Sequence, residues 1–391
     1  MEEKLKIGML SFYYPHLGGS GIITARLASH LSREGHDVHM IGYPGDVNPA
    51  HMRASGVSLH NTHRIEYPCL KNEPFTMTLA SEAVNVDKRV DLDVIHANYA
   101  IPHAVSAYLA REQRRMSGKL LPYVVTGHGS DIHTNGKKDS VNPILDLSLN
   151  SADAVTFVSE DLRRIATEQL GYQGEGKVIP NFVDQDVFSP GESKLRRQLG
   201  ISDDSFVVGH VSNFAPIKNT YAFERLAKHL RDNGKLEGIH FIMAGDGKQK
   251  SSLEEYLVKQ GVSENFHFLG ELPASEIPDV YNASDCVALP SRHEGNPLTL
   301  LESMACAVPV IGSRVGGIEE TISGGGGFLF ESFSTQEFAD IVMNLKNNPE
   351  VAKKAGEDGL RKVKLKYSPS VILNRYLDTF EQVIRNARSN N

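Results

Sequence analysis

Lys6-Ile-Gly-Met-Leu-Ser11, followed by Gly18-Gly-Ser-Gly21 and then by residues 22–33, is the stretch that decides the fold. The first segment is apolar and indicates a buried strand. A glycine-rich turn follows it, and residues 22–33 carry apolar side chains at helical spacing. Gly35 stands where a helix often ends, and Val38-His-Met-Ile41 indicates a second strand. This strand–helix–strand order predicts parallel strands joined by a crossover helix.

The same alternation continues along both halves of the chain. Further strands are expected at residues 93–96, 123–126, 154–158, 177–179, 206–211, 240–244, 265–269, 286–289, 308–311 and 327–330. Residues 180–190, with proline at both ends, interrupt the alternation and indicate a linker. We therefore expect an α/β protein with two Rossmann-like domains facing across a cleft, at residues 1–185 and 186–369. An amphipathic helix, residues 370–391, should pack back on the first domain. Ligands of such sheets lie beyond the carboxyl ends of the strands.

Length and composition limit the class of protein. The 391 residues are too many for one ordinary core, and a formal charge of −7 argues against nucleic-acid binding. Cys69, Cys286 and Cys306 are widely spaced and show no metal-ligand pattern, so we expect no metal site and a reducing compartment. The sequence contains no signal peptide and no apolar run of about 18 residues, which predicts a cytoplasmic protein with no integral membrane segment. A homo-oligomer is compatible with these features.

Two glutamates flank the predicted start of a helix in Glu294-Gly-Asn-Pro-Leu-Thr-Leu-Leu-Glu302, which follows the strand at 286–289. Asn296 suits the N-cap and Pro297 the first turn, which places Glu302 on the second turn. Eight helical steps span about 12 Å, against roughly 5 Å between the carboxylates of a retaining glycosidase. An inverting pair stays open, since Glu294 precedes the helix. A role in holding ligand hydroxyls fits better, because a carboxylate accepts two hydrogen bonds at once.

Three other motifs follow predicted strands. Gly18-Gly-Ser-Gly21 precedes a helix N-terminus, which favours phosphate or carboxylate binding, although a tight turn would also need these glycines. His128 lies between two glycines in Thr126-Gly-His-Gly-Ser-Asp131, and this position favours a function at the edge of the cleft. Lys218 ends Ser212-Asn-Phe-Ala-Pro-Ile-Lys218, where a cation would meet a diphosphate, but it would also suit plain solvent exposure.

Some polar residues have plainer explanations. His96 ends a predicted strand and His103 follows shortly after; spacing does not decide which of the two is merely structural. Asp91-Leu-Asp93 has the form of a metal-binding motif, but it precedes a strand, so we interpret it as solvated. Ser323-Gly-Gly-Gly-Gly327 has no helix directly after it and predicts a turn.

Together these residues resemble the retaining GT-B glycosyltransferases of family 4, from Lys6 to about Tyr367. Within that family the N-terminal half is similar to the N-acetylglucosaminyl L-malate synthases of bacillithiol biosynthesis. The stretches that carry this second resemblance are Gly18-Gly-Ser-Gly-Ile-Ile23, Thr78-Leu-Ala-Ser81, Ile95-His-Ala-Asn-Tyr-Ala-Ile-Pro-His-Ala-Val105 and His128-Gly-Ser-Asp-Ile132.

The resemblance implies a UDP-sugar donor, a small-molecule acceptor, no cofactor and no metal. Glu302 would hold the ribose, Glu294 the sugar hydroxyls and Lys218 the diphosphate. The implied catalytic residues are His128, Glu294 and Lys218. The implied donor-binding residues are Gly18, Gly19, Asn213, Asn296, Leu298 and Glu302. The implied acceptor-side residues are Ser20, Tyr99 and Thr126.

The chain departs from those synthases at two positions on the donor side. Ala215 stands where they carry arginine, and Gly295-Asn296-Pro297 replaces a Phe-Gly or similar pair. Proline has no N–H to offer a ligand. N-acetylglucosamine as donor sugar and L-malate as acceptor are the leading expectation. The alternatives are a cell-surface glycan or lipid acceptor, a UDP-N-acetylglucosamine 2-epimerase-like isomerase, and a non-catalytic binding protein.

Overall fold

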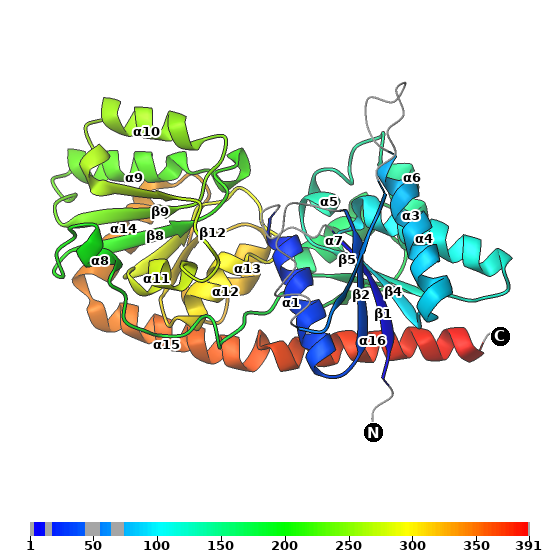
Figure 1. Cartoon of the computed structure of the whole chain (residues 1–391). Helices are drawn as coiled ribbons and strands as arrows, with labels where there is room; N and C mark the ends of the chain where they lie inside the picture. Colours follow the sequence, from blue (N-terminus) through cyan, green and yellow to red (C-terminus); the bar gives the residue numbers. More distant parts are fainter. Residues whose placement is uncertain (1–3, 12–17, 44–54, 64–73, 390–391) are drawn as a thin grey trace. The chain divides into compact units, whose positions relative to one another are not determined.

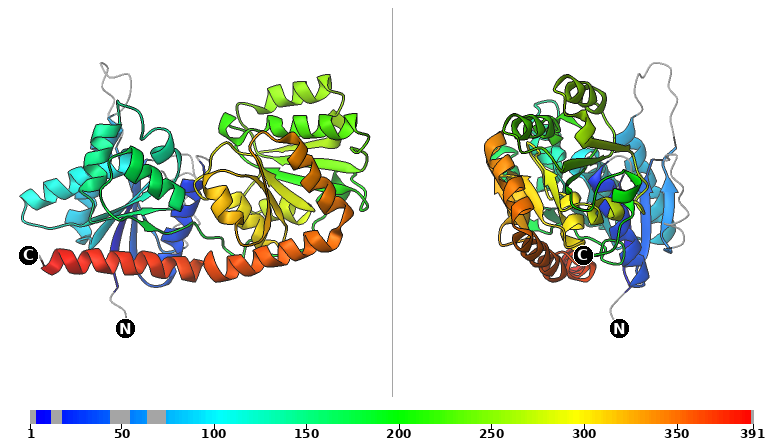
Figure 2. Two further views of the ribbon diagram at one scale, coloured as in Figure 1. Left: turned by 180° about the vertical axis from the view of Figure 1, so that it is seen from behind. Right: turned by 90° about the vertical axis from the view of Figure 1, so that its left-hand side faces the viewer.

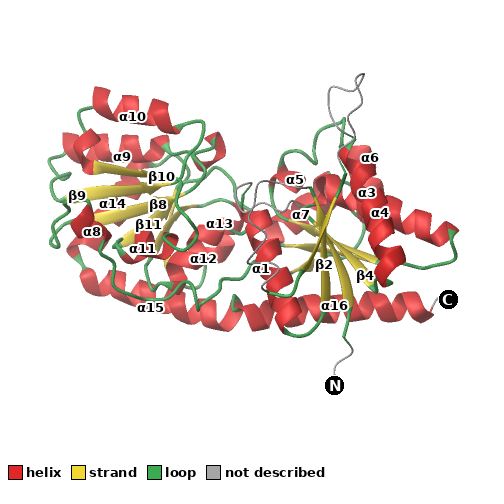
Figure 3. Ribbon diagram, in the orientation of Figure 1, coloured by secondary structure: helices red, strands yellow, loops and turns green. Residues whose placement is uncertain are grey.

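The chain forms two compact units, each built around its own sheet. The computed structural model describes residues 4–11, 18–43, 55–63 and 74–389 (Figure 1). Unit 1 comprises residues 1–181 and 369–391, and unit 2 comprises residues 182–368. The division after residue 181 lies close to the predicted one after residue 185. Both units combine a parallel sheet with helices, as Figure 3 shows, so the expected α/β class is confirmed.

The sheet of unit 1 has, among the described residues, seven parallel strands in the order β3-β2-β1-β4-β5-β6-β7. Their bounds are β1 Lys6–Leu10, β2 Asp37–Gly42, β3 Ser58–Asn61, β4 Val94–Asn98, β5 Tyr123–Gly127, β6 Ala154–Phe157 and β7 Lys177–Val178. The sequence reading missed β3. This strand is polar and partly exposed, because it lies at the edge of the sheet as far as the chain is described, where it pairs with β2.

Helices cover this sheet, with α1 on one side and α3 and α4 on the other (Figure 1). The helices of unit 1, in the part of the chain that the structure describes, are α1 Gly19–Arg33, α3 Phe75–Val90, α4 Ala100–Met116, α5 Ser130–His133, α6 Asn142–Asn150, α7 Glu160–Gln169 and α16 Pro369–Ser389. The last helix of the chain, α16, belongs to unit 1 and runs alongside it in the left view of Figure 2. Its Tyr376 and Phe380 rings each lie 5.2 Å from the ring of His96 on β4.

Unit 2 repeats the architecture with six parallel strands, among the described residues, in the order β10-β9-β8-β11-β12-β13. Their bounds are β8 Phe206–Val211, β9 Ile239–Ala244, β10 Phe266–Gly270, β11 Cys286–Leu289, β12 Val310–Ser313 and β13 Gly327–Phe330. The order runs outward from β8 in one direction and from β11 in the other. The carboxyl ends of these two strands therefore form a topological switch point, where ligands of open parallel sheets bind.

The helices of unit 2 include two short 3₁₀ turns, η2 and η3. The bounds are α8 Leu195–Gln198, η2 Pro216–Lys218, α9 Tyr221–Asp232, α10 Lys250–Lys259, η3 Ser263–Asn265, α11 Ile277–Asn282, α12 Leu298–Ala305, α13 Gly316–Ile322, α14 Thr335–Asn347 and α15 Pro349–Lys366. The free thiols of Cys286 and Cys306 are buried among these elements, whereas Cys69 lies outside the described residues.

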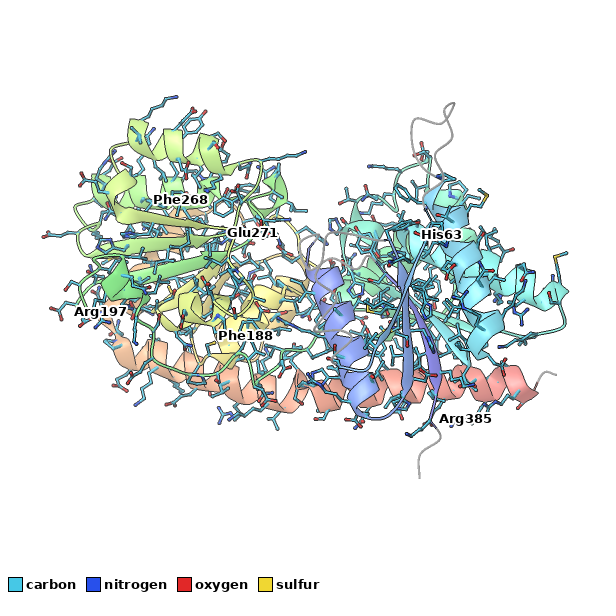
Figure 4. The ribbon with its side chains drawn as sticks, in the orientation of Figure 1. His63, Phe188, Arg197, Phe268, Glu271 and Arg385 are labelled. Carbon is cyan, nitrogen blue, oxygen red and sulfur yellow. The ribbon has the colours of Figure 1, made fainter. Side chains whose placement is uncertain are left out.

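The two units divide within the predicted linker at residues 180–190, and the side chains of Val183 and Phe188, beyond the division, belong to the core of unit 2. Phe182 and Val183 are fully buried and Phe188 is 1% exposed. The Val183 N–H donates to the Tyr367 carbonyl at 3.0 Å. Phe188, labelled in Figure 4, has its ring centroid 6.0 Å from that of Tyr281. The linker is therefore not a solvent-exposed segment along its whole length, since Val183 and Phe188 are buried.

The acidic pair before β4 is held by cations and by backbone rather than being merely solvated. Asp91 Oδ1 lies 2.6 Å from Lys119 Nζ, and this interaction lowers the pKa of Asp91. Asp93 Oδ2 accepts a hydrogen bond from the Lys6 N–H at 2.9 Å. Asp93 therefore ties the start of β4 to the start of β1 and does not face a ligand site.

Candidate active site

Two loops meet at the switch point of unit 2: the β8–α9 loop (residues 212–220) and the β11–α12 loop (residues 290–297). The Arg292 N–H donates to the Ile217 carbonyl at 2.8 Å. Asn219 adopts a positive φ of 52° and its Nδ2 donates to the Pro290 carbonyl at 3.1 Å. These contacts fix the two loops against each other beyond the ends of β8 and β11.

Lys218 and Glu294 form an ion pair across these loops. Lys218 Nζ lies 2.6 Å from Glu294 Oε1, and Ser291 Oγ donates to the same oxygen at 2.7 Å. The side chains of Lys218 and Glu294 are 22% and 12% exposed, so the pair is only partly solvated. The structure thus brings together two predicted site residues that are 76 positions apart. Ser291, a further polar partner, lies two residues after the end of β11 and was not singled out from sequence.

Glu302 lies on the second turn of α12, as predicted, and is 7% exposed. Its Oε2 accepts a hydrogen bond from the buried hydroxyl of Tyr281 at 2.9 Å. Burial and the neighbouring Glu302 carboxylate raise the pKa of Tyr281 well above its usual range, so the phenol stays protonated and acts as a donor. The two glutamates therefore have different partners and different surroundings.

The start of α12 differs from the prediction. The helix begins at Leu298, and Pro297, with ψ 122°, occupies the N-cap position without a side-chain cap. Asn296 lies one position before the N-cap, and its Nδ2 donates to Thr321 Oγ1 at 2.9 Å. Leu298 is buried at 9% exposure, so only its backbone suits a donor-binding role. Asn296 thus joins the start of α12 to α13.

Asn213 lies in the β8–α9 loop, beside the loop that follows β9. A methyl group on Gly247 would lie 1.9 Å from the Asn213 carbonyl oxygen, so the two backbones are in close contact. Gly247 has φ 151°, a conformation that favours glycine. Asn213 is therefore at the carboxyl edge of the sheet, as expected for a donor-binding residue.

His210 is a buried residue of this region that the sequence reading treated only as part of a strand. Its Nδ1 lies 2.9 Å from the Ala288 carbonyl and its Nε2 lies 2.7 Å from Ser212 Oγ. Burial lowers the pKa of His210 to about 4, so the ring is neutral at pH 7. The same Ser212 Oγ accepts from the Phe214 N–H at 3.2 Å. His210 therefore holds the start of the β8–α9 loop through its hydrogen bond with Ser212.

In unit 1, α1 begins at the predicted glycine-rich turn. Gly18 precedes the helix with φ 115° and no side-chain cap, and a methyl group on it would have open space around it. Gly19 is exposed and Ser20 is partly exposed in the first turn. Glycine is needed at position 18 for its backbone conformation. The first-turn N–H groups of α1 are suited to an anion.

His128 follows β5, and Asp131 holds its loop. The buried Asp131 carboxylate accepts from the Gly129 N–H at 2.7 Å, from the Ala100 N–H at 2.7 Å and from the His128 N–H at 3.2 Å. It thereby ties the loop after β5 to the start of α4. The sequence motif contained Asp131, but only the fold shows this role.

The His128 ring is neutral at pH 7, because burial and the nearby His103 lower its pKa to about 3. Its Nε2 is enclosed and has no hydrogen-bond partner within the described part of the chain. An unpartnered buried polar atom costs about 1–3 kcal/mol. The ring is therefore suited to hydrogen bonding with a ligand hydroxyl rather than to pairing with a phosphate charge.

Tyr99 lies beside the same loop, at the start of α4. Its hydroxyl is 2.5 Å from Ser130 Oγ, and burial raises its pKa to about 12. Tyr99 has φ 75°, which is unusual for a residue with a side chain and marks a constrained position. Tyr99 and His128 thus belong to neighbouring loops at the carboxyl edge of the unit 1 sheet.

Thr126 is fully buried inside the sheet, and its hydroxyl is engaged. Its Oγ1 lies 2.7 Å from His96 Nε2 and 2.7 Å from Thr156 Oγ1. The acceptor-side prediction for Thr126 therefore gains no support. Burial lowers the pKa of His96 to about 3, and His96 is a structural histidine that links β4, β5 and α16. The Nδ1 of His103 contacts the carbonyls of Asn98 and Tyr99.

The described residues contain neither a metal-binding cluster nor a membrane-spanning helix. Across residues 4–11, 18–43, 55–63 and 74–389, no three His, Cys, Asp or Glu side chains cluster in a way that could hold a metal ion. No helix in these ranges has the length and apolar character needed to cross a membrane.

Comparison with known proteins identifies both units. The family profile "Glycosyltransferase Family 4" matches residues 17–187, and "Glycosyl transferases group 1" matches residues 191–362. N-acetyl-alpha-D-glucosaminyl L-malate synthase of Bacillus anthracis is 31% identical over 394 residues, covering 99% of each chain.

Solved structures agree on the fold. Alr3699/HepE of Anabaena in complex with UDP and glucose matches with a TM-score of 0.79 and 22% identity, covering 96% of this chain and 99% of that one. Sucrose-phosphate synthase of Thermosynechococcus elongatus matches with a TM-score of 0.80 and 17% identity, covering 98% of this chain and 100% of that one. The chain therefore belongs to the family 4, group 1 glycosyltransferases and has the GT-B fold.

Proposed function

We propose that this glycosyltransferase moves N-acetylglucosamine from its UDP ester to the hydroxyl of L-malate, with retention at the anomeric carbon and without a metal ion or cofactor. The observation that carries the proposal is the Lys218–Glu294 pair, with Glu302 nearby in sequence on α12, at the switch point of unit 2. The whole-chain similarity to an N-acetyl-alpha-D-glucosaminyl L-malate synthase supports this choice of donor and acceptor.

The residues of unit 2 suit the three parts of a UDP-sugar. The Glu302 carboxylate can accept two hydrogen bonds from the ribose hydroxyls while Tyr281 fixes its orientation. Lys218 would turn from Glu294 to the diphosphate, and its charge would stabilise the leaving group. Glu294 and the backbone that follows it would receive the sugar hydroxyls. Pro297 offers no N–H, so the loop's own amide donors come from the residues before it.

The proposed transfer needs no external base to take up the acceptor proton. The bond between the anomeric carbon and the diphosphate oxygen breaks, and the acceptor oxygen bonds to that carbon on the same face. The acceptor proton passes to the departing diphosphate oxygen, so UDP carries it away. Neutral His128 would hydrogen-bond a donor-sugar hydroxyl near the reacting carbon, and Tyr99 and Ser20 would contact the acceptor.

The test is an acceptor screen with UDP-N-acetylglucosamine that measures UDP release and product mass. We expect UDP release with L-malate, a product mass of N-acetylglucosaminyl malate, and no release by the Glu302→Ala variant. Analysis of the product by NMR should show the α-anomer, and added EDTA should not reduce the rate. Transfer only to a glycan or lipid would contradict the malate assignment, and conversion of the donor sugar without acceptor would indicate an isomerase.

A further inference from the structure

The β11–α12 loop rests on the backbone of α13. The Gly317 N–H donates to the Glu294 carbonyl at 3.0 Å. A methyl group on Gly317 would lie only 1.4 Å from the Gly295 carbonyl oxygen, so the first turn of α13 and the loop are in direct contact. Any shift of α13 therefore moves the backbone that follows Glu294.

The buried hydroxyl of Thr321 also joins the same loop to the body of α13. Asn296 Nδ2 donates to Thr321 Oγ1 at 2.9 Å, and Thr321 Oγ1 donates to the Gly317 carbonyl at 2.6 Å. Asn296 is 7% exposed and Thr321 is fully buried. The Thr321 hydroxyl thus donates its proton within α13 and accepts a hydrogen bond from the loop. An apolar side chain can do neither.

Lys362 of α15 holds the other end of α13. Its Nζ donates to the carbonyls of Thr321 at 2.5 Å and Ser323 at 2.6 Å, and the residue is 8% exposed. The last carbonyls of a helix have no partner within the helix, and a cation there is favourable. Lys362 therefore anchors the end of α13 from which Thr321 reaches the loop.

We infer that Thr321, anchored by Lys362, is a positioning residue that fixes the β11–α12 loop for the sugar of the donor and so sets affinity for the sugar rather than for UDP. The inference rests on the proposed function, in which this loop receives the sugar hydroxyls and Glu302 holds the ribose. The braced segment contains Asn296 but not Glu302, whose hydroxyl partner, Tyr281, lies on α11. Loss of the hydrogen bond between Thr321 and Asn296 should therefore weaken binding of the sugar and leave binding of the ribose unchanged.

The experiment compares the dissociation constants of UDP-N-acetylglucosamine and UDP by calorimetry for the wild type, Thr321→Val and Thr321→Ser. Valine keeps the shape but removes the hydroxyl, whereas serine keeps the hydroxyl. We expect Thr321→Val to raise the ratio of the UDP-N-acetylglucosamine constant to the UDP constant about tenfold, with UDP itself changed less than about twofold. Thr321→Ser should keep the ratio of the wild type.

Two further variants separate positioning from general loss of stability. Thr379→Val removes a buried hydroxyl from α16 in unit 1, where Oγ1 donates to the Arg375 carbonyl at 2.8 Å, and it should leave the ratio unchanged. Lys362→Met should raise the ratio in the same direction as Thr321→Val, which keeps a test available if one variant folds poorly.

The outcomes distinguish this inference from the proposed function. If the wild type binds both ligands but Thr321→Val weakens both equally, or weakens neither, the inference is overturned and the proposed function stands. If the wild type binds UDP but not UDP-N-acetylglucosamine, the proposed function fails, and the inference fails with it because there is no sugar contact to position.

Discussion

Lys218 Nζ lies 2.6 Å from Glu294 Oε1, and this ion pair joins the loops that follow β8 and β11. Both side chains are largely buried, so solvent screens neither charge fully. A diphosphate would compete with Glu294 for the lysine, and release of Glu294 would leave its carboxylate ready for sugar hydroxyls. In the proposed function, the pair would therefore link binding of the diphosphate to binding of the sugar.

Lys218→Ala should lower kcat/KM with UDP-N-acetylglucosamine by about a hundredfold, because one positioned donor at a developing charge is worth that much. Steady-state UDP release measures the effect. Lys228→Ala is the matched control, since Lys228 forms an exposed pair with Asp232 at 2.7 Å on α9 and should leave the rate unchanged. A Lys218→Ala enzyme with the kinetics of the wild type would remove the lysine from the proposed mechanism.

Tyr281→Phe should raise the dissociation constant of UDP about fivefold. The change removes the hydroxyl that donates to Glu302 Oε2 at 2.9 Å, so the carboxylate loses its orientation and a hydrogen bond worth about 1 kcal/mol. Calorimetric titration with UDP provides the measurement. Tyr256→Phe changes a tyrosine that is 48% exposed on α10 and serves as control. Equal affinities in the two variants would argue against this support for Glu302.

Acidification should destabilise unit 1, because buried histidines must be neutral there. Burial lowers the pKa of His96 to about 3 and that of His103 to about 4, against 6.5 for an exposed histidine. Between these values the unfolded chain binds more protons, so the stabilisation is complete above pH 6.5 and is lost as pH falls toward 4. Each histidine contributes a slope of about 1.4 kcal/mol per pH unit.

Thermal unfolding between pH 7.5 and pH 5 measures this dependence. We expect Tm to fall across the range for the wild type, and His96→Gln to show a smaller fall because one proton-linked group is absent. The same substitution should also lower Tm at pH 7.5, since His96 bonds to Thr126 and packs against α16. An identical fall for both proteins would show that His96 does not contribute to acid sensitivity.

Gly317→Ala should destabilise unit 2 and weaken UDP-sugar binding, because the added methyl group would overlap the Gly295 carbonyl oxygen. Overpacking of this kind typically costs about 1–3 kcal/mol. Gly191→Ala is the control, since a methyl group there would have its nearest neighbour, Asn282 Nδ2, at 3.5 Å. Denaturant unfolding and calorimetry measure the two effects. Similar behaviour of the two variants would contradict the close contact between α13 and the β11–α12 loop.

Most of the fold could be predicted from the sequence, because strand and helix periodicities are local. Apart from the edge strand β3, the strands were expected within a few residues of their observed bounds. Proline indicated a linker at residues 180–190, where the two units divide, but the burial of Val183 and Phe188 in the core of unit 2 depends on tertiary contacts. The N-cap of α12 is Pro297 and not Asn296 as predicted, and the contact of Asn296 with Thr321, 25 positions away, depends on the tertiary structure.

The candidate site, like the fold, could be predicted from the sequence only in part. The sequence by itself determined the motifs around Glu294, Glu302, Lys218 and His128 and their places at the carboxyl ends of strands, because those depend on order along the chain. Only the tertiary structure decided that Lys218 pairs with Glu294, that Tyr281 supports Glu302 and that Thr126 is buried. These are contacts between residues distant in sequence, and they exist only once the parallel sheets bring their strands, helices and loops together.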